Sequence, residues 1–460
     1  MRFRGYLAGL ALLGLACGVP QSGRDFGWDA VPKILEKISS PVFPDRDFCI
    51  TDYGAVGGGK MDCTGAIGRA IEDCGAAGGG SVVVPEGVFL TGAIHLKSRV
   101  NLHLRKNAVL LFSGDTRKYL PSVFTRFEGI ECMNYSPLIY ARGQKDLAVT
   151  GEGTLDGGAD STHWWPWAGK IQYGWGPGDP DPRQDRKRLF QMAEDGVPVE
   201  RRIFGEGRLL RVNFIQFYQC ENILIEGVTI RNSPMWNIHP VLCENVTVRK
   251  VSVISHGPNN DGCDPESCRN VLIQDCYFDT GDDCIAVKSG RNGDGRRVGR
   301  PSENVIVRGC TMKGGHGGVV IGSEISGSCR NVFVENCVMD SPNLERALRI
   351  KTNSRRGGVV ENIYMRDVRV GEVSDAVIGV YFNYEEGDVG SYTPIVRNIR
   401  LSRVTSLKSE YALSLDGYER SPVSGVFLQD CRFEGVRKGS LLNHVSGLVM
   451  KNVRINGELQ

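Results

Sequence analysis

The chain has 460 residues and a nearly balanced formal charge of +2, from 55 basic and 53 acidic side chains. This balance gives no reason to expect a nucleic-acid-binding protein. Its length would allow two or three domains, but a repeat protein grows lengthwise and can reach this size as one domain. The 59 glycines are typical of a fold that turns every few residues.

The first residues resemble an export signal. Arg2 and Arg4 precede an apolar run of ten residues, Leu7 to Ala16, which has no polar face and is too short to span a bilayer. Residues 1–17 are therefore expected to be a signal peptide, and the protein to be periplasmic, an outer-membrane lipoprotein or extracellular. Cys17 follows a small-residue cleavage sequence and is a possible site for a lipid anchor.

An N-terminal extension over residues 18–47 is expected to lead into a single domain over residues 48–460. Thr64 is expected to cap a helix whose apolar residues recur at helical spacing: Ile67, Ala70, Ile71 and Cys74. Short strands begin soon after it, at Val82. A helix in this place would cover the open end of a strand ladder and hide its unpaired edge.

The strand pattern is interrupted at about residues 156–208, which are rich in Pro, Gly, Arg and Asp. This insertion contains Trp164, Trp165 and Trp167. A run of this length without strands, inside a compact domain, is usually functional. Two interpretations stay open: a surface loop packed by its own tryptophans, or a wall over a cleft.

A repeated step then runs through the chain, in which Glu or Arg precedes an asparagine and an alternating apolar strand. The asparagines, separated by 23 to 36 residues, are Asn222, Asn245, Asn270, Asn304, Asn331, Asn362 and Asn398. Coils of this length with period-2 strands predict an all-β fold, a right-handed parallel β-helix. Coil length varies because turns on the binding side carry insertions.

A small apolar side chain lies six residues after each asparagine: Val228, Val251, Cys276, Cys310, Cys337, Val368 and Val404. Since cysteine takes the place of valine here, it behaves as a small buried hydrophobe. The three cysteines are therefore expected to be free thiols stacked in the interior. A metal site is the alternative, but thiols alone in an apolar column lack supporting polar groups.

Four short polar clusters stand in order on this ladder: Asn259-Asn260-Asp261-Gly262, Gly281-Asp282-Asp283, Gly315-His316-Gly317 and Arg349-Ile350-Lys351. Neighbouring coils lie about 4.8 Å apart, so Asp261 and the Asp282–Asp283 pair can converge on one face. Crowded carboxylates raise the pKa of at least one member, which supplies an acid near neutral pH. Hydrolysis of a glycosidic bond needs such an acid and a second carboxylate. For carboxylates alone, a turn or a calcium site is the alternative.

The other two clusters add an imidazole and two cations. His316, between two glycines, can donate a hydrogen bond and tune the proton of the acid. Strand alternation points Ile350 inward and places Arg349 and Lys351 together on the outer face. There they could bind the carboxylate of a negatively charged sugar, Arg through a planar fork and Lys as a point charge.

These four clusters, in this order, resemble those of the polygalacturonase family of pectin-degrading glycoside hydrolases (glycoside hydrolase family 28), and the Trp-rich insertion is closer to bacterial members. The resemblance covers about residues 48–455, with Asn260 in place of the usual threonine. It implies a catalytic β-helix that hydrolyses α-1,4-galacturonosidic bonds of pectic oligo- or polysaccharides with inversion, and with no metal or other cofactor.

By this resemblance Asp282 is the general acid, Asp261 and Asp283 activate water, and His316 modulates the acid. The implied substrate-binding residues are Arg349, Lys351, Asn259 and Tyr384, with Tyr381 as a less close match for the tyrosine.

The insertion favours an enzyme that acts from a chain end, because it is long enough to close one side of the cleft. Its arginines Arg183, Arg186 and Arg188 could then meet the carboxylates of the terminal sugar. Alternatives are a rhamnogalacturonan or other pectic side-chain hydrolase on the same fold, and a non-catalytic carbohydrate-binding β-helix. The intact Arg349 and Lys351 pair favours galacturonate on the leaving side of the bond.

Overall fold

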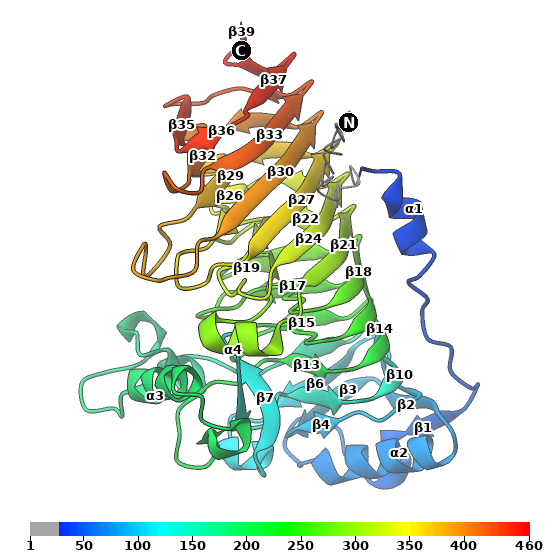
Figure 1. Ribbon diagram of the computed structural model, residues 1–460. Coiled ribbons are helices and arrows are strands. Elements are labelled where there is room, and N and C mark those ends of the chain that lie inside the picture. The colour runs from blue at the N-terminus through cyan, green and yellow to red at the C-terminus, as the bar shows by residue number, and fades with distance from the viewer. Residues whose placement is uncertain (1–26) are drawn as a thin grey trace, which may run out of the picture.

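The computed structural model describes residues 27–460, which form a long stack of coils (Figure 1). Within this range no helix has the length and apolar character needed to cross a membrane. The expected signal peptide, residues 1–17, and the lipid-anchor site at Cys17 lie outside the described residues and stay predictions.

Three long parallel sheets make up the stack. The first, of 14 strands, contains in spatial order β1 (Asp47–Cys49), β2 (Gly80–Val84), β5 (Val100–Leu104), β10 (Lys145–Gly151), β14 (Glu221–Glu226), β16 (Glu244–Arg249), β18 (Arg269–Gln274), β21 (Ser302–Arg308), β24 (Cys329–Glu335), β27 (Val359–Arg366), β30 (Ile395–Ser402), β33 (Val423–Gln429) and β36 (Val445–Ser446), with β37 (Val449–Lys451) also paired to β33.

The second sheet has 13 strands: β3 (Gly87–Thr91), β6 (Ala108–Phe112), β11 (Thr154–Asp156), β15 (Thr229–Arg231), β17 (Ser252–Ser255), β19 (Tyr277–Thr280), β22 (Thr311–Met312), β25 (Val338–Met339), β28 (Arg369–Glu372), β31 (Thr405–Lys408), β34 (Arg432–Phe433), β38 (Arg454–Ile455) and β39 (Glu458–Leu459). Only the last pair, β38 and β39, is antiparallel in this sheet. The chain therefore climbs one coil at a time and meets each sheet once per coil.

The third sheet is made of β4 (Ile94–His95), β9 (Ile139–Arg142) and β13 (Ile215–Tyr218), followed by β20 (Ile285–Val287), β23 (Val319–Ile321), β26 (Arg346–Lys351), β29 (Ala376–Tyr381), β32 (Tyr411–Asp416) and β35 (Ser440–Asn443). Single parallel bridges through Ile238 and Cys263 connect its two parts. The parallel β-helix predicted from the sequence is confirmed.

The repeated asparagines form a ladder along the first sheet. Each lies at a positive φ, between 56° and 62°, a region that asparagine tolerates better than most residues. From Asn245 onward, the side-chain amide of each asparagine donates to the side-chain oxygen of the asparagine on the preceding coil, at 2.7 to 3.3 Å. The ladder satisfies the polar groups at this turn of each coil and fixes the register of the strands that follow.

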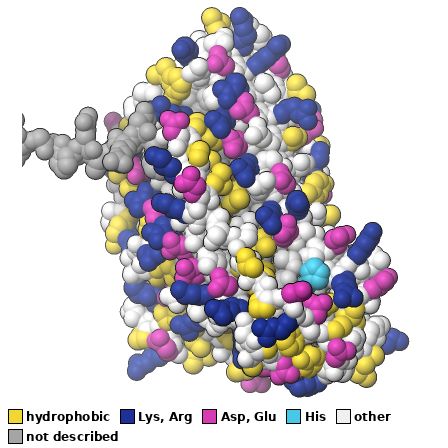
Figure 2. Space-filling model, turned by 90° about the vertical axis from the view of Figure 1, so that its right-hand side faces the viewer, with side chains coloured by type: hydrophobic (Ala, Val, Ile, Leu, Met, Phe, Trp, Pro, Cys, Tyr) yellow, Lys and Arg dark blue, Asp and Glu magenta, His cyan; other side chains and the backbone are white. Residues whose placement is uncertain are grey.

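Charged residues before these asparagines also pair between coils. Arg269 binds Glu244, Arg330 binds Glu303, and Arg397 binds Glu361. Basic and acidic side chains are interspersed over the face in Figure 2. The ion pairs between coils explain why Glu and Arg alternate in the repeated step from Glu244 onward, because opposite charges directly across a sheet are favourable.

The interior of the coils is one continuous apolar core, and the predicted column of cysteines and valines lies inside it. Cys276, Cys310 and Cys337 are buried members of this core together with Val251 and Val368. All three are free thiols. The expected role of cysteine as a small buried hydrophobe is confirmed.

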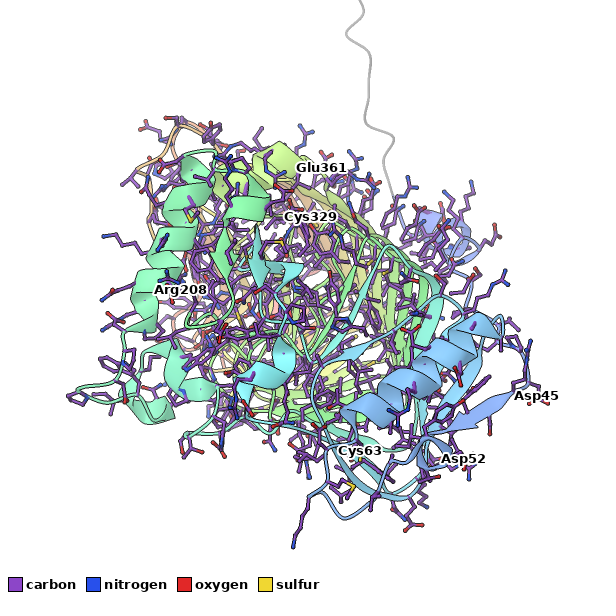
Figure 3. The ribbon with its side chains drawn as sticks, turned by 90° about the horizontal axis from the view of Figure 1, so that it is seen from below. Asp45, Asp52, Cys63, Arg208, Cys329 and Glu361 are labelled. Atoms are coloured by element: carbon purple, nitrogen blue, oxygen red, sulfur yellow. The ribbon has the colours of Figure 1, made fainter. Side chains whose placement is uncertain are left out.

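Helix α2 (Thr64–Ala76) lies across the N-terminal end of the stack (Figures 1 and 3). Its buried face, which includes Ile67 and Ile71, covers the first coils, as predicted. Thr64 is not the cap residue, however. It is the first helical residue, and Asp62 accepts hydrogen bonds from its amide and its hydroxyl because a carboxylate is the better acceptor.

The expected N-terminal extension carries a short helix, α1 (Ala30–Leu35), on the outside of the first sheet. Trp28, Val31 and Ile34 pack there in a separate apolar cluster with outward-facing side chains of successive strands: Leu272, Ile306, Phe333 and Tyr364. This part of the chain is therefore fastened to the coils by apolar contacts.

The insertion at residues 156–208 folds into η3 (Trp165–Ala168), η4 (Ile171–Tyr173), α3 (Pro182–Glu194), η5 (Val199–Arg201) and β12 (Ile203–Phe204). Strand β12 joins a small sheet with the hairpin of β7 (Val123–Phe127) and β8 (Ile130–Asn134). Further short elements are η1 (Ile50–Tyr53), η2 (Thr116–Tyr119) and α4 (Asn292–Val298). Insertion and hairpin project together from one side of the N-terminal coils (Figure 1).

The core register predicts that Cys276, Cys310 and Cys337 remain reduced in the purified protein. Alkylation under denaturing, non-reducing conditions should label all three, because strand stacking at about 4.8 Å rather than disulfide geometry sets their separation. Peptide mass spectrometry gives the result directly. A disulfide between any two of them would contradict the free-thiol column.

Candidate active site

The four polar clusters meet on one side of the stack, where the second sheet passes into the third. Cys263 bridges Ile285 on the next coil, so Asp261 and Asp283, each two residues earlier, are direct neighbours. The backbone confirms this register, since the Gly262 amide donates to the Asp283 carbonyl at 2.9 Å. The predicted convergence of the carboxylates follows from the coil register.

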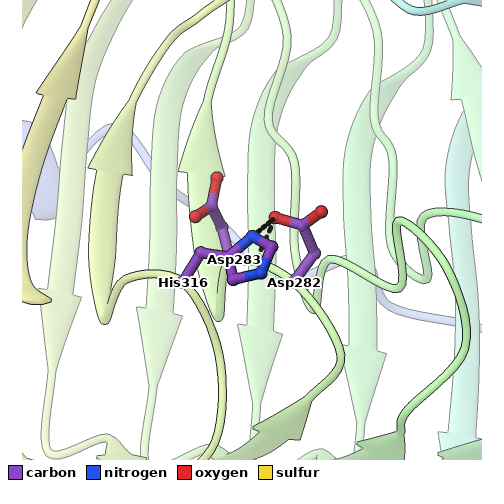
Figure 4. Close-up of side chains that lie close together, drawn as sticks. All are labelled: Asp282, Asp283 and His316. Atoms are coloured by element: carbon purple, nitrogen blue, oxygen red, sulfur yellow. Dashed lines mark hydrogen bonds and ion pairs between the residues drawn. The ribbon is translucent and has the colours of Figure 1, made fainter. Parts of the chain in front are cut away.

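Asp282, Asp283 and His316 form the centre of this cluster (Figure 4). Their polar atoms lie within 4.8 Å of one another. His316 Nδ1 and Asp282 Oδ1 share a hydrogen bond of 2.8 Å. On the other side, Lys351 Nζ donates to Asp283 Oδ2 at 2.7 Å. Each adjacent carboxylate thus faces a different cation.

The strand β26 presents its cations as predicted. Leu348 and Ile350 are fully buried in the core, whereas Arg349 and Lys351 face the cluster. Arg349 Nη1 lies 3.8 Å from Asp283 Oδ1. Both cations lie near the face of the Tyr384 ring, at 5.6 and 5.2 Å from its centroid. The alternation of side chains along the strand therefore sends the apolar residues into the core and the two cations toward the cluster.

Electrostatics divide the three carboxyls. Burial alone would raise the pKa of Asp282, but the hydrogen bond and the positive charge of His316 outweigh it and hold that pKa below the ordinary value. The same hydrogen bond raises the pKa of His316 to about 9. In the free protein at neutral pH, the proton of this pair therefore resides mainly on the imidazole.

Asp261 behaves in the opposite way. Burial, together with the charges of Asp264 and Asp282, raises its pKa. Lys288, whose Nζ lies 3.6 Å from both Asp261 Oδ2 and Asp264 Oδ1, only partly offsets this. Lys288 is itself held by Glu324, at 3.2 Å. Carboxyls separated by one coil thus differ in proton affinity because their counter-ions differ.

Two oxygens of the cluster are buried without a hydrogen bond from any described residue: Asp261 Oδ1 and Asp283 Oδ1. Buried carboxylate oxygens normally have a partner, so such a pair is a ready site for a bound water molecule. Asp261 and Asp283 are direct neighbours, and one water molecule between them could use both acceptors.

Three of these side chains could also serve as metal ligands, since Asp282, Asp283 and His316 are close enough to share an ion. However, Lys351 already binds Asp283, and the raised pKa of His316 keeps its imidazole protonated, whereas a metal ligand must be neutral. The cluster fits acid/base chemistry between charged side chains better than it fits a metal.

A pocket opens above these groups, and the insertion helps to line it. Asp261, Asp282 and Lys351 form one part of its wall, and Trp167, Arg186 and Arg211 another. Trp164, in contrast, is buried against Tyr119, with ring centroids 5.3 Å apart. The two interpretations of the insertion therefore apply to different residues: some pack it, and others border the pocket.

The remaining predicted residues are also placed. Asn259 and Tyr384 line the pocket, and Asn259 Oδ1 accepts a hydrogen bond of 2.7 Å from Arg211. Tyr381 instead accepts a hydrogen bond of 3.0 Å from Arg346. Asn260 is fully buried and ties its turn to the carbonyls of Ser233 and Met235, at 3.0 Å each.

Similarity to known proteins identifies the family of this chain. Residues 209–452 match the model of the Glycosyl hydrolases family 28. The chain belongs to this family. It is 30% identical over 417 residues to a probable polygalacturonase of Vitis vinifera, covering 86% of this chain and 77% of that protein. It is 26% identical to an exo-poly-alpha-D-galacturonosidase of Dickeya chrysanthemi, covering 79% of this chain but 60% of that protein.

Among solved structures, a hyperthermoactive exopolygalacturonase from Thermotoga maritima superposes with a TM-score of 0.91 and 49% identity, over 94% of this chain and 96% of that one. The polygalacturonase of Erwinia carotovora, at 22% identity and a TM-score of 0.68, shares the fold. The sequence-based prediction of a family 28 glycoside hydrolase is confirmed.

The family 28 motifs did not reveal every group of this site. Lys288 and Glu324 supply buried charges beside Asp261, yet neither was predicted to act there. Lys288 could have been found by the alternation argument used for Arg349, because Ile285 and Val287 point inward and Lys288 outward. Glu324 follows a strand end, and its sequence position carries no such signal.

The His316–Asp282 pair predicts a pH-dependent stability. Because the pKa of His316 is raised from 6.5 to about 9 on folding, its contribution is fully present below pH 6.5 and is lost as pH rises through 9. Solvent weakens the effect, since the His316 side chain is 45% exposed. The difference in Tm between wild type and His316→Ala should therefore shrink as pH rises through this window.

The matched control is His444→Ala, at an exposed position far along the stack. It should leave the pH dependence of Tm as in the wild type. A wild-type to His316→Ala difference that stays constant from pH 6 to 10 would contradict the assigned pair.

Proposed function

We propose that this family 28 hydrolase is a polygalacturonase that removes galacturonate from a chain end with inversion of configuration. The observation that carries the proposal is a pocket in which Asp261, Asp282 and Lys351 share the lining with residues of the insertion, while Asp283 and His316 lie beside Asp282. The exo-acting relatives from Thermotoga maritima and Dickeya chrysanthemi support it.

In the proposed mechanism Asp282 protonates the oxygen of the leaving sugar. Asp282 borders the pocket. His316 Nδ1 lies 2.8 Å from Asp282 Oδ1 and holds a proton that can pass to the carboxylate. Bringing a negatively charged substrate beside Asp282 raises its pKa, because like charges disfavour ionisation. Substrate binding thus moves the shared proton toward the group that must deliver it.

Asp261 and Asp283 activate the attacking water. Their free oxygens, Asp261 Oδ1 and Asp283 Oδ1, are acceptors on neighbouring coils. The carboxylate of Asp283 supplies the negative charge, because Lys351 and Arg349 face it as cations. Asp261 in its ionised form would take up the proton of the water as it attacks, and its raised pKa makes that ionised form a stronger base.

Arg349 and Lys351 are proposed to bind the carboxylate of the sugar on the leaving side. Arg349 is buried, and its Nε–H donates to no acceptor among the described residues. A carboxylate between the two cations would gain charge-assisted hydrogen bonds. It would also compete with Asp283 for Lys351, so that substrate binding would weaken the ion pair between these two residues.

The exo preference rests on what closes the pocket. Glu128, at the turn of the β7–β8 hairpin, projects into it and is bound by Arg186 Nε at 2.8 Å. Arg291 also pairs with Glu128, with Nη1 at 3.4 Å from Glu128 Oε2. These ion pairs link the hairpin, α3 and the segment before α4 into one wall. A polymer could not continue through such a wall, so a chain end must enter the pocket.

Aryl galacturonides can separate the roles of the two carboxyls. Asp282→Asn should lose roughly 10²- to 10⁴-fold in kcat on galacturonan, because an amide cannot donate the proton. On an aryl galacturonide with an acidic phenol as leaving group, it should keep most of its activity, since that leaving group needs no proton. Asp261→Asn should lose activity on both substrates, and the reverse pattern would exchange the two assignments.

The products test the exo proposal. Digestion of polygalacturonate should yield one short product with slow loss of viscosity, because each event removes only a chain end. NMR of the first-formed product should show the β anomer, since inversion converts the α linkage. A rapid fall in viscosity with a spread of oligomers would show an open cleft, and an α anomer would rule out inversion.

A further inference from the structure

We propose that Arg211 binds the carboxylate of the terminal galacturonate and so makes the enzyme specific for an acidic sugar at the chain end. This inference rests on the proposed exo action. Arg211 belongs to none of the four sequence clusters. It precedes β13 and lines the pocket together with residues of the insertion.

Arg211 is held rigidly without being neutralised. The residue is only 5% exposed. Its Nη1 donates to the carbonyls of Pro258 and Pro234, at 2.5 and 3.2 Å, and its Nη2 donates to Asn259 Oδ1 at 2.7 Å. These three acceptors are neutral. The guanidinium is therefore oriented by hydrogen bonds, but its charge has no direct counter-ion among the described residues.

The other cations of the pocket wall are already compensated or solvated. Arg186 pairs with Glu128, Arg183 with Asp181, Lys288 with Glu324 and Lys351 with Asp283. Lys170 is exposed to solvent. Arg188, which the sequence also suggested for this role, is exposed and does not line the pocket. Within residues 27–460, Arg211 is thus the buried cation of this pocket that lacks a carboxylate.

A buried charge without a counter-ion is costly, and the cost is relieved when an anion binds. Burial lowers the pKa of Arg211 to about 10, so the group is still protonated at neutral pH. A substrate carboxylate would meet the donors that these contacts leave over, Nε–H and one Nη2–H, on a guanidinium already held in place, and charge-assisted hydrogen bonds of this kind are among the strongest in proteins. The structure thus holds a binding group for the anion in place before substrate arrives.

The position of Arg211 fits the terminal sugar rather than the leaving sugar. In coil order, Arg211 comes before the turn that carries Asp261, whereas Arg349 and Lys351 come after the turns that carry Asp283 and His316. Cations therefore flank the carboxylates on both sides. Two adjacent galacturonates, one on each side of the scissile bond, could each place a carboxylate on its own cation.

The test compares trigalacturonate with the analogue whose non-reducing terminal carboxyl is reduced to a primary alcohol. Wild type should prefer the acid by roughly 10- to 150-fold in kcat/KM, the range expected for a hydrogen bond to a charged group. Arg211→Gln should lose a similar factor on trigalacturonate but little on the reduced analogue, so the preference should nearly vanish. A loss that is equal on both substrates would overturn the proposal, because it would mark Arg211 as purely structural.

Two control variants locate the effect. Arg183→Gln removes a positive charge from the same wall, but that charge is paired with Asp181, so the preference for the terminal acid should stay complete. Lys351→Ala should lower kcat/KM on both substrates by a similar factor and also keep the preference. Loss of the preference in either control would show that Arg211 is not the specific contact.

Thermal unfolding is measured for each variant. If Arg211→Gln does not fold, Arg211→Lys replaces it: the charge stays but the fork is lost, so the preference should fall several-fold. A complete preference in a folded Arg211→Lys variant would overturn the proposal. Failure of the exo proposal is seen separately, because the wild type alone would then release a spread of oligomers from polygalacturonate.

Discussion

Backbone hydrogen bonding between successive parallel coils is the constraint on which this enzyme depends. Each coil copies the register of the one before it, and the asparagine ladder repeats the same positive-φ turn at every step. In consequence, residues far apart in sequence become neighbours at about the strand spacing of 4.8 Å. Asp261 and Asp283 meet in this way, and no local interaction between them is needed.

The rigid frame allows charges to be crowded that would otherwise repel. Asp261, Asp264, Asp282, Asp283 and Glu324 all lie within one region, and burial alone would keep several of them neutral. Lys288, Lys351 and His316 decide which carboxyls ionise. The opposite pKa shifts of Asp261 and Asp282 are therefore set in large part by the cation beside each one.

In the proposed exo action, the preference for a chain end arises from segments that are attached to the coils. The β7–β8 hairpin and the insertion are attached to the N-terminal coils, and ion pairs of Glu128 with Arg186 and Arg291 link them to the helix-bearing segment near α4. In the proposed exo action, the stack supplies the catalytic groups and this wall admits only a chain end. Arg211 is held by backbone carbonyls of the coils and lines the pocket together with residues of this wall.

The sequence by itself determined the fold and the places of the predicted catalytic groups on it, because both follow from short-range patterns. Period-2 strands after each asparagine define the coils, and alternation on a strand is enough to send Ile350 inward and Arg349 and Lys351 outward. The tertiary structure decided which charges are free. Arg186 and Arg211 are equivalent as sequence letters, but only folding shows that the first faces Glu128, while the second faces neutral carbonyls. Both arrangements depend on contacts between distant segments, and no spacing along the chain encodes them.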